Sequence, residues 1–274
     1  MKLSTAPTVN SWLMILVALG STLQMTSGFV VPTETMATAR TVSLSASSSS
    51  SETPDRQPWD AFRFVRQSSK FVNFPPFLGK NQNRVVVQPG DILWTPSSSS
   101  SSFGLAPLDD VVMGGASSST FDNNTGMWKG TVTDANNGGF IGIRSTPSCE
   151  WDMKSCQGIQ LKLKLLKTNS ETTAQQQQRK QRFKFVVRDS TDFNGICWTT
   201  SIDVPTKKGM TTVKVPFQKQ VPTLFAKTVP DQTFQSSNVV GLQFAYSKFE
   251  YDGDLNPNFT VGDMHLQILE MSAY

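Results

Sequence analysis

Few residues of this chain have the chemistry of a catalytic or metal site. The sequence has 274 residues, a single histidine, His265, and three cysteines, Cys149, Cys156 and Cys197. A site with several histidine ligands is therefore excluded, and a Ser-His-Asp or Cys-His arrangement would have to use His265. No two cysteines form a CxxC pair, and an odd number argues against a complete disulfide framework. Cys149 and Cys156 are able to pair with each other, but we favour buried or free thiols in a reducing compartment.

The stretch from residue 109 to residue 117 combines carboxylates with conformational freedom. Its sequence is Asp-Asp-Val-Val-Met-Gly-Gly-Ala-Ser. Adjacent carboxylates on an extended strand point to opposite sides, so Asp109 and Asp110 are not expected to share acid/base work. We expect Asp110 to cap or brace a turn at Gly114-Gly115, where the backbone adopts conformations that a Cβ would forbid. A Ca²⁺ site needs about six to eight oxygen ligands, which this sequence does not assemble, so we expect neither a metal nor a cofactor.

A second motif, Asn-Asn-Gly-Gly-Phe, occupies residues 136–140, and Arg144 follows it. Asn and Gly tolerate positive φ, so this run between two strand-like segments predicts a tight hairpin. Arg144 has two interpretations. Its guanidinium is suited to grip a carboxylate or phosphate bidentately, or it pairs with Asp110 and locks the two loops together. We favour the structural role.

In this order and spacing, the two motifs resemble the complex I intermediate-associated protein 30 family, over roughly residues 108–270. The resemblance implies a galactose-binding-like jelly-roll β-sandwich. Later parts of the family pattern are matched by Pro216-Phe217 and Pro222-Thr223, but the usual Gly-Arg is replaced here by Ala226-Lys227. The binding residues that the resemblance implies belong to the two motifs and to the strand after them: Asp110, Met113, Gly114, Gly115, Ser117, Asn137, Gly138, Gly139 and Arg144.

The resemblance also implies an assembly factor or chaperone rather than an enzyme. We expect a non-catalytic binding protein that assists assembly or biogenesis of an organellar electron-transport complex. That complex would be NADH:ubiquinone oxidoreductase-like or photosynthetic. The partner would be an unassembled subunit or an assembly intermediate, held against the loops that carry the two motifs.

Two other functions stay open. The run from Lys180 to Phe185 interleaves basic and aromatic residues, a composition that can bind single-stranded RNA, and plant members of the broader family are implicated in translation of plastid messenger RNA. In a strand, however, Phe183 and Phe185 would face the core, with the basic residues on the solvated face. The other alternative is a secreted carbohydrate-binding module with glycans on Asn123 or Asn258. The net charge of +4 is mild, and we expect no DNA partner because DNA-binding domains concentrate basic residues on one face.

The N-terminus is typical of a targeting leader. Residues 1–28 contain a short apolar run and small residues, as in a signal peptide, and the run is too short to span a bilayer. Residues 29–51 are rich in Ser, Thr and Ala and contain one acid, as in a transit peptide. Together they resemble the bipartite leader of algae with complex plastids, with Phe29 at the cleavage junction. We therefore expect a plastid (chloroplast) protein with no membrane span in its mature form. The alternative destinations are the mitochondrion and the secretory route.

The remaining chain divides into an N-terminal arm with a Ser-rich linker, residues 52–102, and a family domain, residues 103–274. In the arm, Pro58 starts a predicted helix with Trp59, Phe62 and Val65 on one face. We expect this helix to pack across the domain, with a membrane-surface or partner-docking role as the alternative. A strand is predicted at residues 84–88.

The family domain shows a strand pattern throughout. Apolar and polar residues alternate with period two, which is typical of antiparallel strands with one buried face. Many such strands without a long helical period predict an all-β sandwich. The alternating segments are residues 140–144, 159–165, 183–187, 213–217, 240–246 and 264–268.

Overall fold

The computed structural model describes residues 60–71, 84–96, 103–146, 149–167, 180–192, 195–206 and 209–274. The two predicted leader segments and Trp59 lie outside these ranges. Within them the helices are α2 (Ala61–Ser68) and the 3₁₀ turns η1 (Ser69–Phe71), η3 (Asp110–Met113), η4 (Ala135–Asn137), η5 (Phe217–Lys219) and η6 (Ser236–Asn238). The strands are β1 (Val85–Val86), β2 (Ile92–Trp94), β3 (Gly104–Pro107), β4 (Ser118–Asp122), β5 (Met127–Val132), β6 (Phe140–Thr146), β7 (Trp151–Asp152), β8 (Gly158–Leu166), β9 (Lys180–Arg188), β10 (Cys197–Pro205), β11 (Thr211–Pro216), β12 (Val221–Leu224), β13 (Lys227–Thr228), β14 (Gly241–Ser247) and β15 (Gly262–Ala273).

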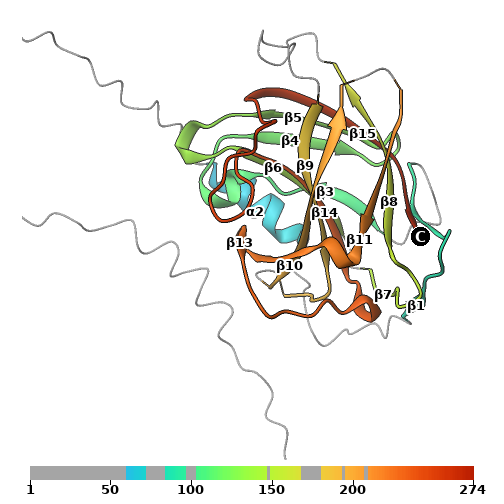
Figure 1. Cartoon of the computed structure of the whole chain (residues 1–274). Coiled ribbons are helices and arrows are strands. Elements are labelled where there is room, and N and C mark those ends of the chain that lie inside the picture. The colour runs from blue at the N-terminus through green and yellow to red at the C-terminus, as the bar shows by residue number, and fades with distance from the viewer. Residues whose placement is uncertain are drawn as a thin grey trace, which may run out of the picture. The chain divides into compact units, whose positions relative to one another are not determined.

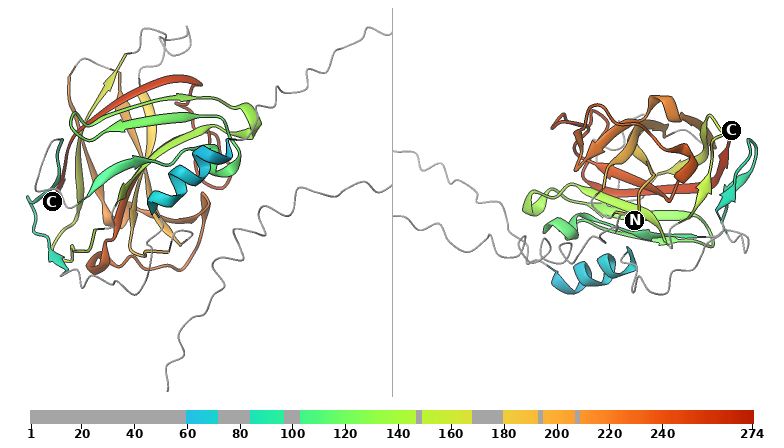
Figure 2. Two further views of the ribbon diagram at one scale, coloured as in Figure 1. Left: turned by 180° about the vertical axis from the view of Figure 1, so that it is seen from behind. Right: turned by 90° about the horizontal axis from the view of Figure 1, so that it is seen from below.

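Two antiparallel sheets lie face to face as a sandwich (Figures 1 and 2). One sheet has seven strands in the order β13-β12-β10-β9-β14-β6-β3. The other has six strands, with the order β11-β8-β15-β5-β4 and β2 paired to β15. The predicted all-β sandwich is confirmed, and the architecture agrees with the jelly roll that the family resemblance implies.

The core lies between the sheets and is made by alternate residues of the long strands. In β9, Phe183, Phe185 and Val187 are fully buried, as the period-two pattern predicted. Phe185 packs on Phe244 of β14 with ring centroids 4.9 Å apart, and Phe183 packs on Trp128 of the other sheet at 6.2 Å. Such ring pairs contribute about 0.5–1.5 kcal/mol each beyond the area they bury. These contacts make the sandwich a stiff support for the loops at its rim.

The Asn-Asn-Gly-Gly run does not form the predicted hairpin. It connects β5 to β6, and these strands belong to different sheets. Asn136 and Asn137 both have φ of 56°, and Gly139 has φ of 125°. The conformational freedom of these residues is therefore used, but to carry the chain across the sandwich. The chain does not fold back on β5 because β6 pairs instead with β3 and β14.

The arm helix α2 packs on the domain through its polar side. Gln67 is buried, whereas Phe62 is 79% exposed and Val65 is 60% exposed. The helix contacts the domain as we expected, but the predicted apolar face with Phe62 and Val65 is not the one that makes the contact. The cause is Asp109, a buried carboxylate on the domain that binds Gln67 and so turns the polar face of the helix inward. Figure 2 shows α2 along the outside of the strands.

Two short strands before the family domain also join it. β1, predicted as a strand, pairs in parallel with β7 through Val85 and Trp151. β2 pairs with β15 through Trp94 and Met271, so Trp94 is buried in the core although it lies in the predicted arm. Among the described residues, no helix has the length and apolar composition needed to cross a bilayer.

Candidate functional site

The carboxylate of Asp110 joins the two sequence motifs. Asp110 is 1% exposed and opens the 3₁₀ turn η3. Its Oδ1 accepts a hydrogen bond from the backbone N–H of Ser117 at 2.9 Å. Its Oδ2 accepts from the backbone N–H groups of Gly139 at 2.9 Å and Phe140 at 3.4 Å. A buried carboxylate is stable only when such donors replace water, so Asp110 fixes both loops at once.

The glycines of the two motifs allow the loops to approach this carboxylate. A Cβ on Gly115 would lie 2.3 Å from Cγ of Asp110, and a Cβ on Gly138 would lie 2.4 Å from its Oδ2. Gly114 ends the 3₁₀ turn with φ of 90°, a left-handed conformation that suits glycine. The brace that we predicted at Gly114-Gly115 is therefore present. The brace also includes Gly138 and Gly139, which we had assigned to a separate hairpin turn.

Further hydrogen bonds close the junction. The amide of Asn136 donates to the backbone carbonyl of Gly114 at 3.1 Å. The hydroxyl of Ser117, a fully buried residue, donates to the carbonyl of Thr133 at 3.0 Å. Met113, unlike these buried residues, is 74% exposed at the end of η3. The junction therefore presents one apolar side chain to solvent above a rigid polar base.

Asp109 organises a second junction, which the sequence did not reveal. It is fully buried and accepts hydrogen bonds from the backbone N–H of Ser119 at 2.8 Å, from the hydroxyl of Ser119 at 2.6 Å and from the N–H of Gly142 at 3.3 Å. Gln67 of α2 donates to it at 3.0 Å and accepts from its backbone N–H at 2.9 Å. Arg63 lies 3.7 Å away. Burial raises the pKa of Asp109 despite these donors. The carboxylate thus ties the arm helix to β4 and β6.

Arg144 lies apart from the Asp110 junction. It sits on β6, and its guanidinium is 5.7 Å from the ring centroid of Phe71, at the end of η1. Burial and the nearby Arg188 lower the pKa of Arg144 to about 10. No Asp110–Arg144 ion pair occurs within the described ranges, because backbone N–H groups occupy the Asp110 carboxylate. The predicted pairing of the two loops through Arg144 was therefore wrong.

The basic residues of β9 are engaged within the protein. Lys180 and Arg182 both bind Asp203 of β10, each at 2.7 Å. Hydrogen bonding to Arg182 and Lys180 lowers the pKa of Asp203 to about 2. The ammonium of Lys184 is buried and donates to the carbonyl of Glu250 at 2.7 Å. These contacts pair the three basic residues with groups of the protein, and Phe183 and Phe185 face the core.

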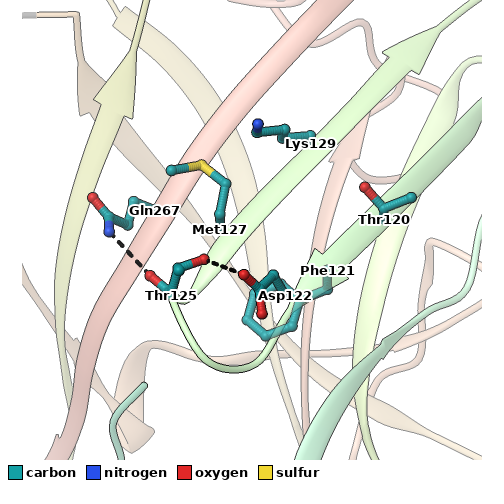
Figure 3. Close-up of a pocket in the computed structure, with 7 residues that line it drawn as sticks. All are labelled: Thr120, Phe121, Asp122, Thr125, Met127, Lys129 and Gln267. Carbon is teal, nitrogen blue, oxygen red and sulfur yellow. Dashed lines mark hydrogen bonds between the residues drawn. The ribbon is translucent and has the colours of Figure 1, made fainter. Parts of the chain in front are cut away.

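A shallow depression lies on the outer face of the six-stranded sheet (Figure 3). It has a volume of about 570 Å³ and is lined by Thr120, Phe121, Asp122, Thr125, Met127, Lys129 and Gln267. His265 lines the adjoining depression, where burial and Lys129 lower its pKa. In Figure 3, Thr125 binds both Asp122 and Gln267, so these polar groups already have partners. The depression brings together none of the residues that we predicted as binding residues.

The described part of the chain contains no group of three or more His, Cys, Asp and Glu side chains placed to hold a metal ion. Cys149, Cys156 and Cys197 are free thiols, so the possible disulfide between the first two is not formed. Burial raises the pKa of Cys149 to about 12, which keeps it protonated and unreactive.

Comparison with known protein families shows to which family the chain belongs. The model described as complex I intermediate-associated protein 30 (CIA30) matches residues 94–268. The chain belongs to this family. The residues of the Asp110 junction lie inside the CIA30 match, and so do those of the Asp109 junction except Arg63 and Gln67 of α2, which precede it. No curated protein gives a significant match to the chain.

Several solved structures are similar in fold. One is the family 11 carbohydrate-binding module of the cellulosomal cellulase Lic26A-Cel5E of Clostridium thermocellum, with 16% identity and a TM-score of 0.42 over 69% of this chain and 96% of the module. Another is the agarase AgWH50C, with 9% identity and a TM-score of 0.38 over 67% of this chain and 26% of the agarase. At these TM-scores the likenesses carry no information about ligands.

The first prediction concerns the contact between Gly115 and Asp110. Replacing Gly115 by Ala is expected to lower the free energy of unfolding by about 1–3 kcal/mol, because the new Cβ overlaps the fixed carboxylate. In an Asp110→Ala background the same replacement should cost much less, since the atoms it meets are gone. Gly114→Ala is the matched control and should cost the same in both backgrounds. Urea unfolding of the unchanged protein, the three single variants and the two double variants measures this, and equal costs for Gly115→Ala in both backgrounds would contradict the proposed contact.

The second prediction concerns the attachment of α2. Gln67→Ala removes two hydrogen bonds from Asp109 and leaves buried polar groups unsatisfied, at a cost of about 1–3 kcal/mol. The amides of α2 should then exchange with deuterium faster, while those of the core strands change little. Arg66→Ala, an exposed position on the same helix, should leave exchange unchanged. Unaltered exchange in Gln67→Ala would show that other contacts hold the helix.

Proposed function

We propose that this protein is a non-catalytic assembly factor that holds an unassembled subunit or intermediate of an organellar electron-transport complex. The complex is NADH:ubiquinone oxidoreductase-like or photosynthetic, and the compartment is the plastid. Membership of the CIA30 family supports the assembly role. The composition of residues 1–51 supports the plastid as destination.

The observation that carries the proposal is that both carboxylates of the first motif are buried and bonded within the protein. Asp109 and Asp110 are both buried, and their oxygens accept hydrogen bonds from Ser117, Ser119 and Gly139. Neither carboxylate is open to a substrate. The motifs therefore set the shape of the loops, and what the loops offer to a partner is their outer surface, including Met113.

The other two functions receive less support from the described residues. An RNA-associated factor would need free basic groups near Phe183 and Phe185, but these rings are buried and Arg182 is paired with Asp203. A secreted module with a glycan on Asn123 would have to release the amide of Asn123, which donates to the carbonyl of Leu105 at 3.1 Å.

The third prediction tests the function directly. A C-terminal tag on the full chain allows imaging in cells, capture of the protein and mass spectrometry of bound proteins. We expect signal from the plastid and co-purification of subunits from one electron-transport complex. Ribosomal proteins with one messenger RNA would replace the proposal with the RNA-associated factor. A secreted, glycosylated product would overturn both organellar functions.

A matched pair of variants provides the control for this experiment. Met113→Asn should reduce the retained subunit about tenfold, because burying a Met side chain contributes about 1.5–3 kcal/mol to binding. Met210→Asn changes an exposed methionine outside the two loops and should leave retention unchanged. Equal retention by the two variants would show that the loops around Asp110 do not contact the partner.

A further inference from the structure

The turn between β12 and β13 has an unfavourable sequence for its conformation. Phe225 and Ala226 connect the two strands and have φ of 49° and 61°. Two-residue hairpin turns with positive φ at both positions normally contain Asn and Gly, because a Cβ is disfavoured there. A bulky side chain at such a position is an outlier. The chain therefore holds Phe225 against its backbone preference.

The side chain of Phe225 gains no burial in return. It is 73% exposed at the tip of the hairpin, and the adjacent Leu224 is exposed as well. Both the backbone and the hydrophobic effect thus oppose this arrangement in the isolated protein. Residues held in sparsely populated conformations concentrate at functional sites, where the strain accompanies a role outside the fold.

A second hairpin lies against this tip. Phe249 and Leu255 are bridge partners in the chain between β14 and β15, and both are exposed. The turn between them contains Asp252 and Gly253, with φ of 56° and 94°, a sequence that suits this conformation. The two hairpins together carry four exposed apolar residues, Leu224, Phe225, Phe249 and Leu255. We call these four residues the tip surface.

Asp252 fixes the two hairpins to each other. Its backbone N–H donates to the carbonyl of Ala226 at 2.9 Å. Its carboxylate accepts from the backbone N–H of Thr228 at 2.7 Å and from the hydroxyl of Thr228 at 2.5 Å. These bonds lower the pKa of Asp252, so the contact is present at neutral pH. In Figure 1, β13 lies at the end of the seven-stranded sheet.

The hairpin with Phe249 is hydrogen-bonded to one of the two motif loops. The backbone N–H of Lys248, next to Phe249, donates to the carbonyl of Gly139 at 2.8 Å. Gly139 in turn donates to Asp110. Two hydrogen bonds thus link this hairpin to the carboxylate that holds the motif loops.

The charges around the tip surface favour a protein as the partner. Apart from the buried Glu250, the hairpins at residues 221–228 and 247–256 contain Lys227 and Lys248 against Asp252 and Asp254, a net charge of zero. Anionic lipid surfaces attract clusters of Lys and Arg, so this surface is not suited to a membrane. An apolar centre with charges of both signs at its edge is the usual composition of a protein–protein interface.

We propose that the tip surface is a docking site for an apolar segment of the protein subunit that this chain holds. The inference rests on the proposed function and adds the surface that recognises the subunit. Phe225 is the central contact. Its side chain is 73% exposed at the tip. The hydrogen bonds of Asp252 already fix the turn, so binding costs less conformational entropy.

The fourth prediction separates stability from binding. Phe225→Asn with Ala226→Gly installs the favoured turn and should raise Tm by about 2–6 °C, while retention of the subunit falls about tenfold. Ala226→Gly alone should raise Tm and leave retention unchanged. Phe62→Asn, which replaces an equally exposed ring on α2, should change neither quantity. The probes are the subunit captured with the tagged protein and an unfolded model polypeptide, reduced and carboxymethylated α-lactalbumin.

The outcomes distinguish this inference from the proposed function. If the double variant retains the subunit as the unchanged protein does, the docking site is wrong and the assembly role stands. If the unchanged protein captures no electron-transport subunit but binds the model polypeptide through Phe225, the docking site stands and the assembly role falls. Loss of retention together with a lower Tm would assign the turn a structural role and overturn the inference. The inference would also be overturned, in favour of a membrane, if the double variant lost binding to phosphatidylglycerol vesicles but kept binding to the model polypeptide.

Discussion

The burial of two adjacent carboxylates is the constraint on which the arrangement of the two motif loops depends. An ionised carboxylate taken from water is stable only when hydrogen-bond donors replace the lost hydration. Asp109 and Asp110 lie on consecutive residues and are satisfied by separate sets of donors, mostly backbone N–H groups. Each donor set comes from distant parts of the chain. Satisfying the two charges therefore requires α2, β4, β6 and the loop before β6 to converge on η3.

This convergence explains why small and flexible residues occur where they do. Backbone N–H groups can reach a carboxylate only where no side chain intervenes, and Gly115 and Gly138 have no room for a Cβ. The asparagines of the second motif take the positive φ that brings Gly139 into position. The residues with the strongest signal in the sequence are thus those that support the loops. The residues available to a partner, such as Met113 and Phe225, carry a weaker signal because exposure imposes no spacing on them.

The sequence predicted the features that depend on local order. Period-two alternation identified the long strands and their buried face, since a strand shows its burial directly in its own residues. It also predicted positive φ in the Asn-Asn-Gly-Gly run. It could not predict that this run crosses between sheets, because that depends on which distant strand β6 pairs with. The same limit applies to α2. Its apolar face is clear in the sequence, but the attraction of Gln67 to a carboxylate 42 positions away along the chain decided its orientation.

Among the described residues, three turns have positive φ at two consecutive positions, and their sequences fit this conformation to different degrees. The turns at Asn136-Asn137 and Asp252-Gly253 use residues that tolerate it, and both turns also make tertiary hydrogen bonds. The turn at Phe225-Ala226 uses residues that do not, although its position at a solvent-exposed tip imposes no steric limit on Asn or Gly. Folding alone would therefore favour a different sequence here. Since the unfavourable residue is also the exposed aromatic one, the same side chain accounts for both the backbone strain and the apolar surface. One requirement outside the fold, contact with an apolar partner, explains both.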